Sequence, residues 1–174
     1  MKTAIRLLLA LLAVGAILGS PAWGGDGGSS SYAWHRPELE YLKAVNRAGP
    51  PRDPQLLFLL MGQYANANLH GEGAEFLSAR LKEFESQLSD NQKALYLVAI
   101  GLLRAGHANE VPLLRRIGWI KETIATLEEA KRLSDGQVFV VRWASGVVYA
   151  PLPGLFNQRD AARADLTWCV ANAD

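Results

Sequence analysis

Three histidines and one cysteine are the side chains of this chain best suited to metal binding or nucleophilic chemistry. Zinc sites usually draw such residues from short, fixed spacings, for example two histidines four residues apart on one helix. His35, His70 and His107 show no such spacing and no carboxylate arranged with them. We therefore predict no metal site, and we expect the histidines to be solvated or to cap helices.

Cys169 is the single cysteine, so no disulfide can form within the chain. A reactive thiol needs a polar, electropositive setting, whereas Cys169 lies on an apolar helical face. The sequence also has no Gly-x-Ser-x-Gly elbow, no phosphate-binding loop and no glycine-rich turn from strand to helix. We therefore predict a buried cysteine, no cofactor and no catalytic residues, so the protein is expected not to be an enzyme.

The charge of the chain is nearly balanced, with 18 lysines and arginines against 17 acidic residues. Nucleic-acid-binding proteins usually show a strongly basic face. The densest basic spot here is Arg115-Arg116 with Lys121, which is small and is interpreted as a solvated helix face. We therefore expect no nucleic-acid partner.

Residues 1–22 have the pattern of a secretory signal peptide. Lys2 and Arg6 precede an apolar run from Leu7 to Leu18, and small residues with one proline lead to a cleavage point after Ala22. The run is shorter than the roughly 18–20 residues of a spanning helix. We expect an exported protein, periplasmic or secreted if the source is bacterial, with no stable membrane insertion after cleavage. An uncleaved anchor is the alternative.

Residues 23–36 begin with a glycine- and serine-rich stretch, and we predict a flexible leader there. The remaining residues 37–174 suit a single domain that folds by burial of apolar side chains. Apolar residues recur at helical spacing through most of this domain. About seven helices are expected after the signal peptide, at 37–48, 54–69, 74–88, 91–105, 120–133, 138–149 and 160–173.

Local signals mark the ends of several of these helices. Asp53-Pro54 and the Ser89-x-x-Gln92 capping box predict helix starts, and Ser134-Asp135-Gly136 predicts a stop. We expect residues 70–73 to form a turn and residues 106–119 to form an irregular insertion. Val138–Val141 is β-branched and would also suit a strand, but the apolar run continues too far for one.

Gly62, Gly101 and Gly146 each lie inside a long apolar helical stretch. A glycine in a helix interior costs about 1 kcal/mol relative to alanine, so its recurrence indicates a compensating gain. We expect close approach of a neighbouring helix at all three glycines. An ordinary helical bundle with incidental glycines is the alternative.

These positions resemble the tetratricopeptide repeat, in which pairs of helices stack into an α-solenoid. In the first unit Phe58-x3-Gly62 fits, with Met61, Ala65 and Ala74 at adjoining family positions. The third unit has Ser145-Gly146, Tyr149, Ala162, Leu166, Cys169 and Asp174. The second unit has Ile100-Gly101, whereas Thr123, Leu127 and Ala130 are displaced by about ten residues. The resemblance covers up to three units over roughly residues 54–174, and it implies an all-α fold of helical-hairpin repeats for the domain 37–174.

In that family the leading helices line a concave groove that holds a peptide or the tail of another protein. Carried over by position, the groove would include Gln63, Asn66 and Trp143. Asparagine and glutamine can pair with an extended main chain, and tryptophan gives an apolar anchor. Core packing is the alternative role for Trp143. The resemblance therefore predicts a non-catalytic module for protein or peptide binding.

The apolar C-terminal segment 166–174 lacks the polar face of a capping helix, and self-association through it is a second way to bind a partner. Similar helical segments also accompany metallo-β-lactamase-like hydrolase domains. The His-x-His-x-Asp-His signature of that family is missing here. The alternative function is therefore the N-terminal helical part of a larger exported hydrolase or transport assembly, whose active domain lies outside this chain.

Overall fold

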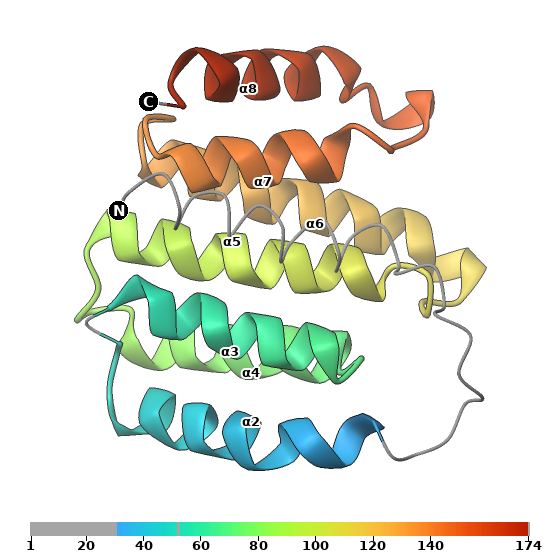
Figure 1. Ribbon diagram of the computed structural model, residues 1–174. Helices are drawn as coiled ribbons and strands as arrows, with labels where there is room; N and C mark the ends of the chain where they lie inside the picture. The colour runs from blue at the N-terminus through green and yellow to red at the C-terminus, as the bar shows by residue number, and fades with distance from the viewer. Residues whose placement is uncertain (1–30, 52, 174) are drawn as a thin grey trace.

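The structure, a computed structural model, describes residues 31–51 and 53–173 (Figure 1). Regular structure in these residues is entirely helical, which confirms the predicted all-α class. The predicted signal peptide at 1–22 and the first part of the predicted leader lie outside the described residues. The elements are α2 (Ser31–Ala48), α3 (Pro54–Asn66), α4 (His70–Phe84), α5 (Asp90–His107), α6 (Leu113–Leu133), α7 (Phe139–Tyr149), the short 3-10 helix η1 (Gly154–Phe156) and α8 (Arg159–Ala171).

Each helix packs mainly on the helices that are next to it in the chain. Helix α5 has the most extensive contacts, with α4 on one side and α6 on the other, and it also contacts α3 and α7. Figure 1 shows the resulting order from α2 at one end to α8 at the other, with α5 near the middle. The fold therefore depends on contacts between neighbours along the chain rather than on one central layer.

The core follows the apolar stripes of these helices. On α6, a helix that is mostly exposed, the buried residues are Thr123, Leu127 and Ala130. Leu127 and Ala130 are completely inaccessible to solvent and belong to the same apolar cluster as α5 and α7. These three residues are the ones that the resemblance assigned to displaced repeat positions, and they form the buried face of α6.

Three predicted helix boundaries are confirmed by their hydrogen bonds. The main-chain N–H of Gln55 donates to the Asp53 carboxylate at 2.8 Å, at the start of α3. At the start of α5, Ser89 and Gln92 form the reciprocal capping box. Helix α6 ends before Asp135 and Gly136, both with positive φ, as the predicted stop requires.

Other boundaries differ from the predictions. Helix α2 begins at Ser31, so residues 31–36 are helical and Pro37 lies inside the helix. Residues 70–73 are not a turn but the first turn of α4. The chain reverses earlier, at Asn68, whose left-handed φ of 55° lets a short connection join α3 to α4.

The predicted irregular insertion is also shorter than expected. Helix α6 begins at Leu113, immediately after Pro112, and runs through Gly118. Proline is well tolerated at a helix start, and an exposed glycine costs only about 1 kcal/mol, so neither residue breaks the helix. The segment Val138–Val141 leads into α7 as a helix, which excludes the strand alternative.

The glycines are not equivalent. A Cβ atom on Gly101 would lie 2.6 Å from Leu127 Cδ2, and one on Gly146 would lie 2.7 Å from Leu166 Cγ, so both glycines permit close helix approach. At Gly62 nothing described lies within 4 Å of the Cβ position, so the expected close approach is wrong for that glycine. The sequence analysis missed Gly73, where a Cβ would overlap the Tyr64 side chain.

Helix α8 is less buried than predicted. Cys169 faces the core as expected, but Val170, which belongs to the apolar segment 166–174, is 80% exposed. Val170 follows Cys169 by one residue, which turns it by about 100° around the helix and away from α7. Over the described part of the chain, we find no helix with the length and apolar character needed to cross a membrane.

Candidate binding groove

A groove runs along α5 between α4 and α6. Its volume is about 580 Å³. Its floor is a stripe on α5 formed by Lys93, Leu97, Ile100 and Arg104, which lie at the spacing of one helix face. The residues that line it are Ser78, Leu81, Lys82 and Glu85 on the α4 side, Asp90, Lys93, Leu97, Ile100 and Arg104 on α5, and Thr126, Glu129, Arg132 and Leu133 on α6.

The local sequence explains why α5 can serve as the floor. The capping box of Ser89 and Gln92 fixes the start of α5, so the phase of its first turns is well defined. Gly101 then lets Leu127 of α6 lie directly against the α5 backbone. Because α4 and α6 both pack on α5 at length, they form the two walls of the groove.

The lining carries both signs of charge around an apolar centre. On the α6 wall, Arg132 donates two hydrogen bonds to the Glu129 carboxylate, at 2.7 and 2.6 Å. The same bonds lower the pKa of Glu129 and raise that of Arg132. At the start of the floor, Lys93 Nζ lies 3.8 Å from Asp90 Oδ1. The groove therefore offers paired donors and acceptors at its edges and the half-buried Leu97 between them, with Ile100 buried beneath.

Arg104, at the far end of the α5 stripe, belongs to a compact arrangement with Trp119 and Glu122. The guanidinium of Arg104 lies 4.1 Å from the centroid of the Trp119 ring, and it forms an ion pair with Glu122. The Trp119 indole N–H in turn donates to the main-chain oxygen of Arg104 at 2.8 Å. Stacking and hydrogen bonding hold Arg104 in one orientation, so this end of the groove is preorganised.

Two histidines meet where α4 begins and α5 ends. His70 packs over Gly106, and His107 packs over Gly71. A Cβ atom on Gly71 would lie 3.1 Å from the His107 ring, so the two rings occupy the space that side chains at positions 106 and 71 would fill. His70 is only 8% exposed, and neither of its ring nitrogens has a hydrogen-bond partner. Burial is the main cause of its lowered pKa. The expectation of a solvated or capping histidine is therefore wrong for His70.

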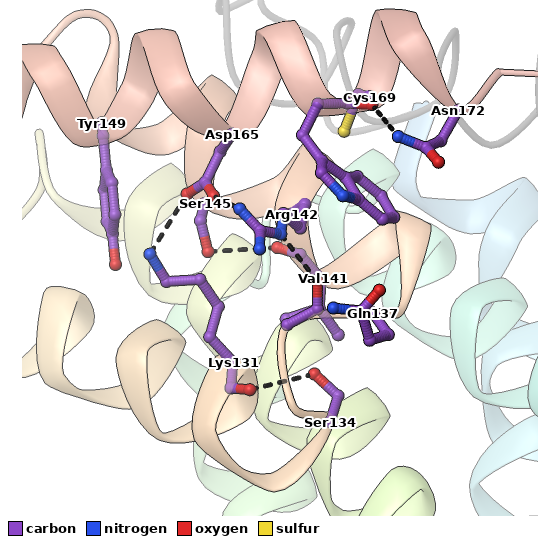
Figure 2. Close-up of polar contacts among 12 residues, drawn as sticks. Lys131, Ser134, Gln137, Val141, Arg142, Ser145, Tyr149, Asp165, Cys169 and Asn172 are labelled. Carbon is purple, nitrogen blue, oxygen red and sulfur yellow. Dashed lines mark hydrogen bonds and ion pairs between the residues drawn. The ribbon is translucent and has the colours of Figure 1, made fainter.

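A buried carboxylate joins α6, α7 and α8. Figure 2 shows Asp165 between Lys131 Nζ and Arg142 Nη1, each 3.1 Å from one carboxylate oxygen. Arg142 also donates from Nε to the main-chain oxygen of Gly136 at 2.7 Å. All the donors belong to the protein itself, so we assign Asp165 a structural role. The sequence analysis missed it because Lys131 and Asp165 lie 34 residues apart.

The three residues predicted for a concave groove lie elsewhere. Gln63 is half-buried on α3, and Asn66 is exposed at the end of the same helix. Trp143 is half-buried on α7 and packs against the core. Helix α5 lies between α3 and α7 and contacts both (Figure 1). None of the three lines the groove between α4 and α6.

A signal for the observed groove was present in the sequence but went unused. Lys93, Leu97, Ile100 and Arg104 place two basic residues at the ends of one apolar stripe. The sequence analysis predicted only a helix over residues 91–105 for that stripe. Its exposure depends on how far α4 and α6 stand apart, which is a property of the packed structure.

Among the described residues, no group of three or more histidine, cysteine or acidic side chains is arranged to hold a metal ion. Comparison with protein families, curated proteins and solved structures gave no match to this chain.

Proposed function

We propose that this protein is an exported, non-catalytic interaction module made of helical hairpins similar to tetratricopeptide repeats. It binds a polypeptide segment of a partner protein in the groove along α5. The observation that carries this proposal is the groove itself, with the apolar side chain of Leu97 between charged residues of both signs.

The packing of the helices supports the repeat interpretation. In a stack of helical hairpins, each helix contacts its neighbours in the chain and each leading helix contacts the next leading helix. Here α3, α5 and α7 hold the positions of leading helices, and α5 contacts both α3 and α7. Gly101 and Gly146 lie on two of these helices, each against a bulky residue of the following helix.

The chemistry of the groove favours a polypeptide over a small charged ligand. Arg132 and Glu129 already neutralise one another, so no strong field of one sign remains to hold an isolated anion or cation. An extended peptide offers apolar side chains for the half-buried Leu97, together with main-chain donors and acceptors for the polar rim.

Site-directed photo-crosslinking in the exporting host tests this proposal. A photoreactive phenylalanine analogue replaces Lys82 on the groove wall, Asn66 on the predicted α3 face, or Asp160 on α8 as a control. All three positions are exposed, so the replacements should leave the fold intact.

We expect a discrete protein adduct from position 82 and none from position 160. Substitution of Leu97 by Gln on the groove floor should remove that adduct without loss of the folded helical signal. An adduct from position 66 that persists in Leu97→Gln would instead support the α3 face predicted from Gln63 and Asn66. Absence of adducts at both 82 and 66 would refute a polypeptide ligand on either surface.

A further inference from the structure

The first turns of α6 expose more apolar surface than any other part of the described helices. Leu113 is 75% exposed, Leu114 is 98% exposed and Ile117 is 51% exposed. Other exposed large apolar side chains, such as Leu155 and Val170, are separated from one another along the chain. Clustered exposure of this kind marks an interaction surface, whereas single exposed apolar residues are ordinary.

These side chains share one face of the helix. At 3.6 residues per turn, Leu113, Ile117 and Leu114 fall within an arc of about 100°. By the same geometry, the core-facing residues Thr123 and Leu127 lie about 140–180° around α6 from Leu114 and about 40–80° from Leu113. All three arc side chains are exposed to solvent, and the arc borders the core face at Leu113.

The same segment is basic. Between Glu110 and Glu122 the chain has Arg115, Arg116 and Lys121 and no acidic residue. Glu122 is already paired with Arg104, so it does not offset these charges. An exposed apolar arc accompanied by unopposed basic residues has the chemistry of an interfacial helix, which buries apolar side chains below lipid headgroups.

The loop before α6 holds this face in place. Arg116 donates to the main-chain oxygen of Asn109 at 3.0 Å and to that of Val111 at 3.1 and 3.3 Å. Val111 itself is buried. The start of α6 is thereby fixed against the end of α5. Binding through Leu113, Leu114 and Ile117 therefore does not require the loop to lose further conformational entropy.

We propose that the first turns of α6 bind the surface of an anionic lipid bilayer. Leu113, Leu114 and Ile117 enter the headgroup region, and Arg115 and Lys121 contact acidic headgroups. The protein lies on the membrane and does not span it. This proposal goes beyond the polypeptide-binding function and does not depend on it, because none of these residues lines the groove.

A fluorescent probe on the apolar arc tests it. In the full chain with Cys169→Ala, the substitution Leu114→Cys is labelled with the polarity-sensitive dye NBD, and Leu155→Cys is labelled as the control. Both positions are exposed, with Leu155 in η1. We expect vesicles that contain phosphatidylglycerol to shift the emission at 114 to shorter wavelength and to leave that at 155 unchanged, whereas phosphatidylcholine vesicles shift neither.

Charge variants complete the test. Each basic residue at an anionic surface contributes about a fivefold increase in affinity, so Arg115→Gln with Lys121→Gln should weaken the vesicle response about 25-fold. Arg159→Gln with Arg163→Gln removes two exposed charges from α8 and should have much less effect. Since all variants share the same N-terminus, binding through residues 1–22 cannot produce this difference.

An unchanged emission at 114 with anionic vesicles would overturn the proposal, as would equal shifts at 114 and 155. A shift at 114 that grows with protein concentration in the absence of vesicles would also overturn it. That result would identify a second copy of the chain as the occupant of the apolar arc.

Discussion

Substitution of glycine by alanine should have opposite effects at Gly62 and Gly101. Both residues lie inside helices, so alanine gains about 1 kcal/mol in helix propensity at either position. At Gly62 nothing described lies within 4 Å of the new methyl group, so the full gain should appear as stability.

At Gly101 the same methyl would lie 2.6 Å from Leu127 Cδ2 and 2.9 Å from Leu127 Cγ. Leu127 is completely buried, so it has no free space into which to move. Overpacking of this kind costs about 1–3 kcal/mol, which cancels or exceeds the gain in propensity. Gly101→Ala should therefore change the free energy of unfolding by between about 0 and −2 kcal/mol.

Gly146→Ala should fall between the two. Its methyl would meet Leu166, but Leu166 is only half-buried and can move toward solvent more easily than Leu127. The expected order of stability is thus the Gly62 variant first, the Gly146 variant second and the Gly101 variant last.

Urea unfolding followed by far-ultraviolet circular dichroism measures this order, with unchanged slopes required for comparison. A difference of 1 kcal/mol corresponds to a shift of about 2–4 °C in Tm for a chain of this size. As a further check, the cost of Leu127→Ala should be smaller when Ala replaces Gly101, because the added methyl partly fills the cavity. Equal stabilisation by Gly62→Ala and Gly101→Ala would refute the reasoning.

Three further predictions concern buried polar groups. Burial, with a smaller contribution from His107, lowers the pKa of His70 below its usual 6.5. Below pH 6.5 the unfolded state binds the proton more readily than the folded state, so the urea concentration at the unfolding midpoint should decrease as the pH is lowered from 7 to 5. The decrease should be smaller in His70→Leu. Asp165→Asn should lower the free energy of unfolding by about 3 kcal/mol in urea titrations, because it removes the carboxylate partner of Arg142 and one of the two carboxylate partners of Lys131, which keeps Glu128 at 2.8 Å; a loss below about 1 kcal/mol would mean that solvent screens these pairs. Burial, with a smaller contribution from the charge of Asp165, raises the pKa of the Cys169 thiol to about 11. Ellman's reagent at pH 8 should therefore react with Cys169 only as the protein unfolds. Rapid labelling of the folded protein would contradict this prediction.

Local chemistry explains which structural features the sequence could predict. The capping box at Ser89 and the stop at Ser134–Gly136 depend on residues within one turn of each other, and both predictions are confirmed. The inner face of α6 was also predictable, because Leu127 and its buried neighbours repeat at helical spacing. Gly118 misled the prediction of the helix start, since one exposed glycine weakens a helix without ending it.

The candidate sites depend on distances between helices that the sequence does not encode locally. His70 and Gly106 pack together although 36 residues separate them along the chain. The groove along α5 similarly depends on the spacing between α4 and α6. Periodicity identifies the inner face of each helix, but it leaves open which outer faces border a groove.

Helix α6 links the two proposed surfaces. Its last turns, with Thr126, Glu129 and Arg132, form one wall of the groove, and its first turns carry the apolar arc. Thr126 and Glu129 lie about 180° and 120° around the helix axis from Ile117. When the side chains of the arc enter the bilayer, to a depth of about 5–10 Å, these two residues of the groove wall therefore face away from it. Membrane binding and polypeptide binding are therefore compatible on one molecule, and attachment at the arc would hold the groove close to the bilayer surface.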